Sequence, residues 1–248
     1  MGIYIGTREV RNIYVYRPRL PVEYQEVERI GRNGNNYIDT ERIPAPSKWY
    51  EVKVGFKPNS MGKRYAILSG YSNNYTSFQW TISLEVTAAN KARFWHQKSW
   101  STLAWDYTTT NTLTAGVFND IVWKLNPSTK LSSMELNGVV TNNSTVYTGT
   151  DGTLSCYMFT DRQPRWTIFT ESSSISYCEI YEWGEKVRDF VPCYRIADGK
   201  IWFYEIVNGV FYTNLWATTF SKGNDVNLRR IKHAYIWNNM IFTDVGES

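Results

Sequence analysis

The sequence has little of what zinc sites, disulfide scaffolds and histidine-based catalysis require. Among 248 residues there are two histidines and three cysteines. The cysteines, Cys156, Cys178 and Cys193, are odd in number and form no C-x-x-C pair, so neither a disulfide framework nor a zinc site is predicted. Free thiols of this kind fit a protein that is assembled in a reducing cytoplasm.

Long apolar runs are also missing. No run approaches the ~18 residues that a membrane span needs, and the segment 1–6 lacks the apolar stretch of a signal peptide. We therefore expect neither membrane insertion nor export through a secretion signal. Release inside a virus particle would take such a protein out of its host without that signal.

A strong charge of one sign is absent. The net charge of +4 comes from 27 basic and 23 acidic residues, which is too small a surplus to indicate nucleic-acid binding, and we expect no nucleic-acid partner. The basic residues concentrate at the two ends, in residues 1–19 and 222–233. Both ends are therefore candidate contact segments.

Aromatic residues are abundant, at 16% of the chain, and they stand beside Thr, Val, Asn and Gly. This composition favours strands. A period of two, typical of half-buried strands, is clearest at Tyr50, Val52, Val54 and Phe56 and recurs at 121–125. No stretch of a dozen residues has helical periodicity with caps at both ends, so we expect at most a turn or two of helix.

Two Asn-Gly pairs, 137–138 and 208–209, interrupt such runs. Asn-Gly tolerates two successive positive φ angles and is the preferred pair of two-residue hairpin turns. Both pairs therefore predict hairpins, the second one joining 204–207 to 210–212. Many short strands between such turns predict an all-β, antiparallel β-sandwich or jelly roll.

The chain divides into three parts. A central domain at 20–223 lies between an N-terminal β arm at 1–19 and a C-terminal basic and aromatic arm at 224–248. The two arms contain loosely similar ribbons, which either pair with each other or dock onto a neighbouring subunit or another protein by strand addition. The candidate assembly residues are Arg11, Tyr14, Tyr16, Arg230, Tyr235 and Trp237.

Both ends of the central domain carry motifs. The opening segment reads LPVEYQEVERI (20–30), followed by Gly34 and YIDT (37–40), and the closing segment reads IYEWGE (180–185), VRDFVPCYR (187–195), YEIVNG (204–209) and FYTN (211–214). These motifs resemble those of a concanavalin A-like (laminin G-like) jelly-roll domain of phage structural proteins and gut-bacterial surface proteins. The resemblance covers about residues 20–223, but its specific motifs lie only at the two ends.

The resemblance implies a virion component, such as a head fibre, tail fibre or decoration protein, because the arm at 5–15 also looks like an element that precedes such domains in phage tail proteins. It implies other virion proteins and host surface glycan as partners, a homo-oligomer, with a trimer as the family-level expectation, and location in the virion. The alternative is a glycan-binding lectin module at a bacterial cell surface.

A glycoside hydrolase is the third interpretation, because related folds include such enzymes. Retaining enzymes need two carboxyl groups about 5 to 5.5 Å apart, which alternate residues of a strand provide. Glu179, Glu182 and Glu185 are spaced by three, so the first two should face opposite sides of a strand. We therefore expect solvated turn carboxylates and no enzyme.

Other chemical candidates are weak. His96 and His233 lie near no nucleophile motif, and Cys193 beside Phe190 and Pro192 is typical of a small buried apolar residue. The aspartates at 106, 120, 151 and 161 are scattered without the spacing of a calcium loop. The sequence predicts no catalytic residue, metal or cofactor.

The segment 71–107 is the candidate ligand-binding region. Flat aromatic rings stack on the apolar faces of sugars, while neighbouring polar groups bond the hydroxyls. Half of these rings would point into the core if the segment forms strands, so core and binding surface remain equal alternatives. The candidate ligand-binding residues are Tyr71, Tyr75, Trp95, His96, Trp100, Trp105 and Tyr107.

Overall fold

The structure is a computed structural model. It describes residues 3–5, 8–10, 20–32, 34, 36–45, 47–72, 79–99, 102–144, 146–147, 151, 155–160, 171–215, 219–226, 231–237 and 240–245. For 71–72, 79–81, 96–99, 102–106 and the strands outside 20–226, it describes the backbone alone. The described chain forms strands and turns without a helix, and it therefore has no helix that could cross a membrane.

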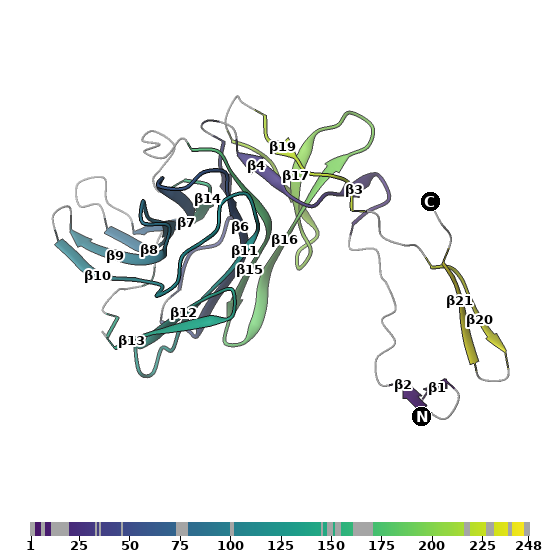
Figure 1. Ribbon diagram of the computed structural model, residues 1–248, viewed down its shortest axis with the longest axis horizontal. Helices are drawn as coiled ribbons and strands as arrows, with labels where there is room; N and C mark the ends of the chain where they lie inside the picture. The colour runs from purple at the N-terminus through teal and green to yellow at the C-terminus, as the bar shows by residue number, and fades with distance from the viewer. Residues whose placement is uncertain are drawn as a thin grey trace.

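Two antiparallel sheets lie face to face (Figure 1). The smaller has the spatial order β10 (Thr102–Thr108), β9 (Ala92–Ser99), β8 (Gln79–Val86), β7 (Tyr65–Ser72), β14 (Cys156–Met158) and β5 (Ile38–Asp39). The larger has the order β13 (Val139–Asn143), β12 (Ser132–Leu136), β11 (Asn119–Leu125), β6 (Tyr50–Pro58), β15 (Ser173–Glu182), β16 (Glu185–Arg195), β17 (Ile201–Glu205) and β18 (Val210–Tyr212). Three short strands pair with its members: β3 (Tyr24–Glu26) with β16, β4 (Ile30–Arg32) with β15, and β19 (Ser221–Lys222) with β4.

The core lies between the sheets and follows the predicted alternation. Tyr50, Val52, Val54 and Phe56 of β6 are buried, as are the alternate residues of β11. At its centre the Phe94 ring of the smaller sheet stacks on the Trp123 ring of the larger one, with centroids 4.0 Å apart and planes at 6°. This contact joins the two layers, and the predicted all-β, antiparallel sandwich is confirmed.

The two Asn-Gly pairs behave differently. Asn137 and Gly138 form the predicted two-residue turn between β12 and β13, with φ of 51° and 82°. The second pair does not, because β17 and β18 are joined by the four-residue turn 206–209 in which only Gly209 has positive φ. The Glu205 carboxylate accepts hydrogen bonds from the backbone N–H groups of Val207 and Asn208, both 2.9 Å long, and this longer turn replaces the predicted one.

Each end of the chain contains a hairpin of its own. β1 (Ile3–Ile5) pairs with β2 (Arg8–Val10), and β20 (Ile231–Trp237) pairs with β21 (Met240–Val245). Neither hairpin pairs with a described strand of the sandwich. Backbone hydrogen bonds of the sandwich itself continue to Val226, whose N–H donates to the Glu26 carbonyl at 2.9 Å.

Candidate functional site

Five of the candidate residues of the segment 71–107 lie on three strands of the smaller sheet. Tyr71 is in β7, Trp95 and His96 are in β9, and Trp105 and Tyr107 are in β10. Trp105 lies opposite His96, and Tyr107 lies opposite Phe94. Tyr75 and Trp100 lie outside the described residues.

Side chains are described for two of these seven residues. Trp95 is 7% exposed, and the guanidinium carbon of Arg93 lies 5.4 Å from its ring centroid. Tyr107 packs against the core, and burial raises the pKa of its hydroxyl. Little of either ring is open to a sugar, and the ligand-binding role of the set stays a prediction.

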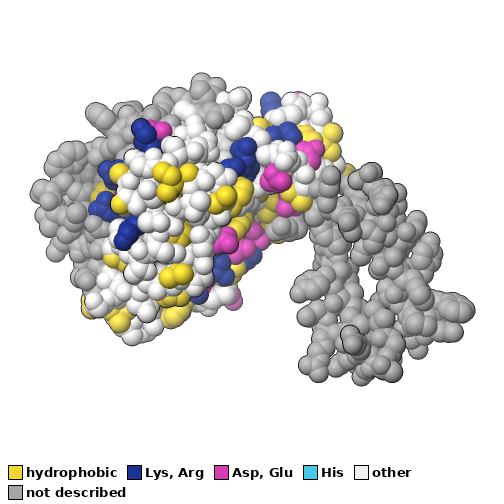
Figure 2. Space-filling model, in the orientation of Figure 1, with side chains coloured by type: hydrophobic (Ala, Val, Ile, Leu, Met, Phe, Trp, Pro, Cys, Tyr) yellow, Lys and Arg dark blue, Asp and Glu magenta, His cyan; other side chains and the backbone are white. Residues whose placement is uncertain are grey.

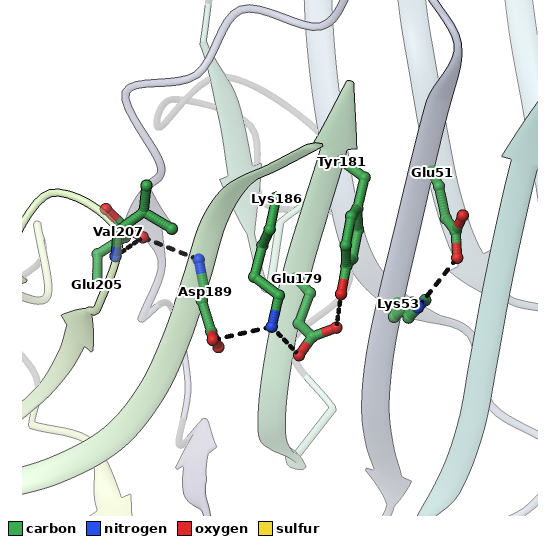
Figure 3. Close-up of polar contacts among 8 residues, drawn as sticks. All are labelled: Glu51, Lys53, Glu179, Tyr181, Lys186, Asp189, Glu205 and Val207. Carbon is green, nitrogen blue, oxygen red and sulfur yellow. Dashed lines mark hydrogen bonds and ion pairs between the residues drawn. The ribbon is translucent and has the colours of Figure 1, made fainter. Parts of the chain in front are cut away.

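The outward face of the larger sheet carries a row of paired charges, which we call the outer-face network: Glu51, Lys53, Glu179, Tyr181, Lys186 and Asp189 (Figure 3). Lys186 Nζ contacts Glu179 Oε1 at 2.7 Å and Asp189 Oδ2 at 3.0 Å. The Tyr181 hydroxyl donates to Glu179 Oε2 at 2.7 Å, and Lys53 Nζ lies 3.2 Å from Glu51 Oε1. The row crosses three strands.

The pairing of charges within the outer-face network determines the pKa of Glu179 and the surroundings of the Tyr181 ring. Burial alone would raise the pKa of Glu179, but the hydrogen bonds and charges of its partners outweigh it and lower that pKa. The ammonium groups of Lys53 and Lys186 lie 4.5 and 5.6 Å from the Tyr181 ring centroid, on either side of the ring in Figure 3. Because both ring faces are covered by cations, this ring is a poor platform for a sugar.

An open aromatic ring lies at the tip of the β15–β16 hairpin instead. Trp183 and Gly184 form its two-residue turn, with φ of 53° and 82°. The Trp183 side chain is 64% exposed. Positive φ costs a non-glycine residue about 1 to 2 kcal/mol, and a largely exposed ring recovers little of that cost by packing. Such strain points to a functional role.

Contacts from a distant segment hold this tip. The Trp183 N–H donates to the Trp49 carbonyl at 2.8 Å. The neighbouring Glu182 accepts from Arg42 Nε at 2.9 Å and from Lys48 Nζ at 2.8 Å. Burial alone would raise the pKa of Glu182, but the hydrogen bonds and charges of these two cations outweigh it and lower the pKa. These contacts attach the turn that carries the Trp183 ring to the segment 42–49.

The carboxylates of β15 differ in part from the prediction. Glu179 and Glu182 lie on opposite faces, as predicted, because they pair with Lys53 and the inward-facing Tyr50. Glu182 is wrongly predicted as solvated: it is 5% exposed and carries two ion pairs. Its partners stand about 140 and 134 positions away in the chain, so no local pattern marks them.

Trp183 was absent from the predicted site, although a signal was present. Trp-Gly separates two alternating runs in the way that Asn-Gly does, and a two-residue turn there would have exposed the ring. The site was predicted in the segment 71–107 instead, because aromatic residues are dense there. The arm residues stay untested: Tyr235 and Trp237 lie in β20, and Arg11, Tyr14, Tyr16 and Arg230 lie outside the described residues.

The three cysteines are free and buried. Burial raises the pKa of the Cys193 thiol to about 12, and its Sγ lies 3.6 Å from the Trp202 carbonyl oxygen. The expected buried apolar character of Cys193 is thereby confirmed. Across the described residues, no three side chains of His, Cys, Asp or Glu gather in a way that could hold a metal ion.

Comparison with known proteins supports the fold. No family model matches the sequence, and no curated protein matches it. Among solved structures, a Bacteroides ovatus protein proposed to bind carbohydrate has a TM-score of 0.53 at 9% identity, covering 80% of this chain and 61% of its own. This chain thus spans about three fifths of that protein.

Two weaker likenesses fall below a TM-score of 0.5. The CBM40 of the Ruminococcus gnavus IT-sialidase, bound to α2,3-sialyllactose, has a TM-score of 0.46 at 14% identity over 66% of this chain and 91% of its own. The Trypanosoma rangeli sialidase in complex with sialic acid has 0.47 at 10% identity over 64% of this chain and 26% of its own. At such identities these likenesses concern the fold alone.

Proposed function

We propose that this chain is a non-catalytic, glycan-binding jelly-roll module with Trp183 as its stacking residue. The observation that carries the proposal is the Trp183 ring, which is 64% exposed on a backbone with positive φ. A flat ring of this kind stacks on the apolar face of a sugar, and neighbouring charged groups bond its hydroxyls. Arg42 and Lys48, at 28% and 41% side-chain exposure, stand beside the tip as such groups.

A binding role fits the carboxylates better than hydrolysis does. Glu179 and Glu182 face opposite sides of β15, so they cannot flank one glycosidic bond. Each of them is also ion-paired, to Lys186 and to Arg42 with Lys48. The Bacteroides ovatus protein of the same fold, proposed to bind carbohydrate, is consistent with this proposal.

The finer part of the proposal is that the module belongs to a phage virion, as a fibre or decoration component that contacts host surface glycan. Its support is the resemblance of the two ends of the central domain and of the N-terminal arm to phage structural proteins. A bacterial lectin is the alternative. A gene that stands among capsid and tail genes would favour the virion, and a gene among polysaccharide-utilisation genes would favour the lectin.

The test of glycan binding replaces the ring without harming the fold. Trp183→Asn removes the stacking surface and installs the residue that two-residue turns of this type prefer. We expect at least a tenfold loss of affinity on a glycan array, with a melting temperature equal to or above that of the parent. Loss of binding could then not be attributed to unfolding.

Two control variants complete the test. Trp183→Tyr keeps a ring and should retain measurable binding, and Val139→Asn changes a residue that is 47% exposed on the distant strand β13 and should bind like the parent. Unchanged affinity in Trp183→Asn, or a parent protein that binds no glycan on the array, would contradict the proposal.

A further inference from the structure

The larger sheet ends in an apolar edge. β18 has the sequence Val-Phe-Tyr and pairs with β17 on one side, and on its other side no described strand pairs with it. Val210 is 43% exposed. Natural sheets usually protect such edges with short strands, lysine, proline or a covering segment, and an exposed edge accepts an additional strand. β18 is short, with three residues. The sequence of β18 contains neither lysine nor proline.

An aromatic patch borders this edge on the outward face, formed by Tyr24, Trp202, Tyr204 and Phe211. Phe211 of β18 is its centre: its ring centroid lies 3.9 Å from that of Tyr24, 4.7 Å from that of Tyr204 and 5.8 Å from that of Trp202. All four residues are half-buried. The patch therefore keeps apolar surface for a partner.

Both ends of the sandwich leave the domain beside this patch. Tyr24 begins β3, so the N-terminal segment arrives there. Val226 is held at the next residues of β3, because its carbonyl accepts from Gln25 Nε2 at 3.1 Å. Four residues separate Val226 from β20, which limits the distance between them to about 17 Å. The C-terminal hairpin is thus tethered near an open edge.

Charge and stability indicate which segment covers the edge. The segment 222–233 carries Lys222, Arg229, Arg230 and Lys232 against Asp225, whereas the segment around β3 carries Glu23, Glu26 and Glu28. Figure 2 shows acidic, basic and hydrophobic side chains next to one another where Figure 1 places β3 and β17. An isolated two-stranded hairpin is marginally stable in water and needs a surface to pack on.

We propose that the edge strand β18 and the aromatic patch receive the C-terminal hairpin, β20–β21, of a second copy of this chain. Within one chain the hairpin forms a sheet of its own, and no described strand pairs with the outer side of β18, so this side is available to a second copy. One strand of the incoming hairpin extends the larger sheet at β18 beside the patch, and the basic residues around the start of β20 meet the glutamates near β3. The product is a homo-oligomer held by exchanged hairpins.

The test compares the two edges of the same sheet by light scattering on the full chain. Val210→Lys places a charge on β18, and Val139→Lys makes the same change on β13 at the opposite edge, where Val139 is 47% exposed. We expect an oligomeric parent, an oligomeric Val139→Lys and a monomeric Val210→Lys. A monomeric parent, or an oligomeric Val210→Lys, would overturn the proposal.

A second variant tests whether the C-terminal hairpin is the segment that binds at β18. Its outcome does not depend on whether the fold tolerates a lysine at position 210. A chain that ends at Val226 keeps every paired strand of the sandwich and removes the hairpin, so it should melt like the parent and be a monomer. An oligomer of this shortened chain would also overturn the proposal. Trp183→Asn should remain oligomeric, so the outcome is independent of glycan binding.

Discussion

The turns at Asn137-Gly138 and Trp183-Gly184 have nearly the same backbone, with φ of 51° and 82° in the first and 53° and 82° in the second. Asn137 adopts its conformation readily, and its own side chain bonds the neighbouring strand β11 through Asp120 N at 2.8 Å and Asn119 Oδ1 at 3.1 Å. Trp183 does neither and depends on contacts from the distant segment 42–49. The first turn has a residue that suits the positive φ and whose own side chain bonds the adjacent strand, whereas the second presents an exposed ring and is held by its backbone and by the neighbouring Glu182.

The largest effect is expected when Asn137 is replaced by tryptophan, the residue type of the other turn. Asn137→Trp should destabilise the protein by about 2 kcal/mol, because it adds the cost of positive φ and removes the hydrogen bonds to β11. Chemical denaturation measures the change. Val140→Trp, at a 54% exposed strand position three residues away, is the control for adding a ring and should cost much less. Equal losses in both variants would show that turn geometry is not the reason.

The tertiary support of the Trp183 turn can be removed on its own. Glu182→Gln keeps the shape of the side chain but loses its charge, and Arg42 and Lys48 can then turn to water because they are partly exposed. We therefore expect a moderate destabilisation of about 1 to 2 kcal/mol. Glu185→Gln, at the exposed strand position paired with Glu182, should change the stability by less than about 0.5 kcal/mol. A larger loss in the control would refute the role of the ion pair.

The smallest effect that we expect is on the pH dependence of stability, through the ion pairs of Glu182 beside the Trp183 turn. The pKa of Glu182 is lowered in the folded protein from its ordinary value of 4.5. A group with a lowered folded pKa stabilises the fold above its unfolded pKa, and this contribution is lost as the pH falls through the folded pKa. Melting temperatures between pH 6 and pH 3 should therefore fall more steeply in the parent than in Glu182→Gln. Parallel profiles would contradict the assignment.

Patterns with a local cause were predictable from the sequence. Alternation in β6 and β11 predicted which residues face the core, and Asn137-Gly138 predicted a hairpin, because each depends on neighbours a few positions apart. The Asn208-Gly209 prediction was wrong in turn type because the Glu205 carboxylate bonds two backbone N–H groups of a longer turn. The side chain of Glu205 therefore determines the type of turn that contains Asn208 and Gly209.

Contacts between distant segments were not predictable. Glu182 reads as an exposed turn residue until β15 is placed next to β6 and the segment 42–48, where it meets two cations. The same reason applies to Gly55, whose position under Tyr177 allows the Tyr177 hydroxyl to reach Asp120 on β11 at 2.9 Å. Alternation tells which face a residue occupies but not which strand lies beside it.

The three buried thiols make it possible to follow how the domain opens. Cys156 of the smaller sheet and Cys178 of the larger one lie in the core between the sheets, whereas Cys193 lies opposite Trp202, on the face that carries the aromatic patch. Because a thiol reagent attacks the thiolate and needs access to it, each cysteine is alkylated only when its own part of the sandwich separates. Mass spectrometry of the modified peptides would thus time the parting of the sheets at Cys156 and Cys178 and the opening of the aromatic patch at Cys193. Equal rates at all three would mean that the patch opens together with the core.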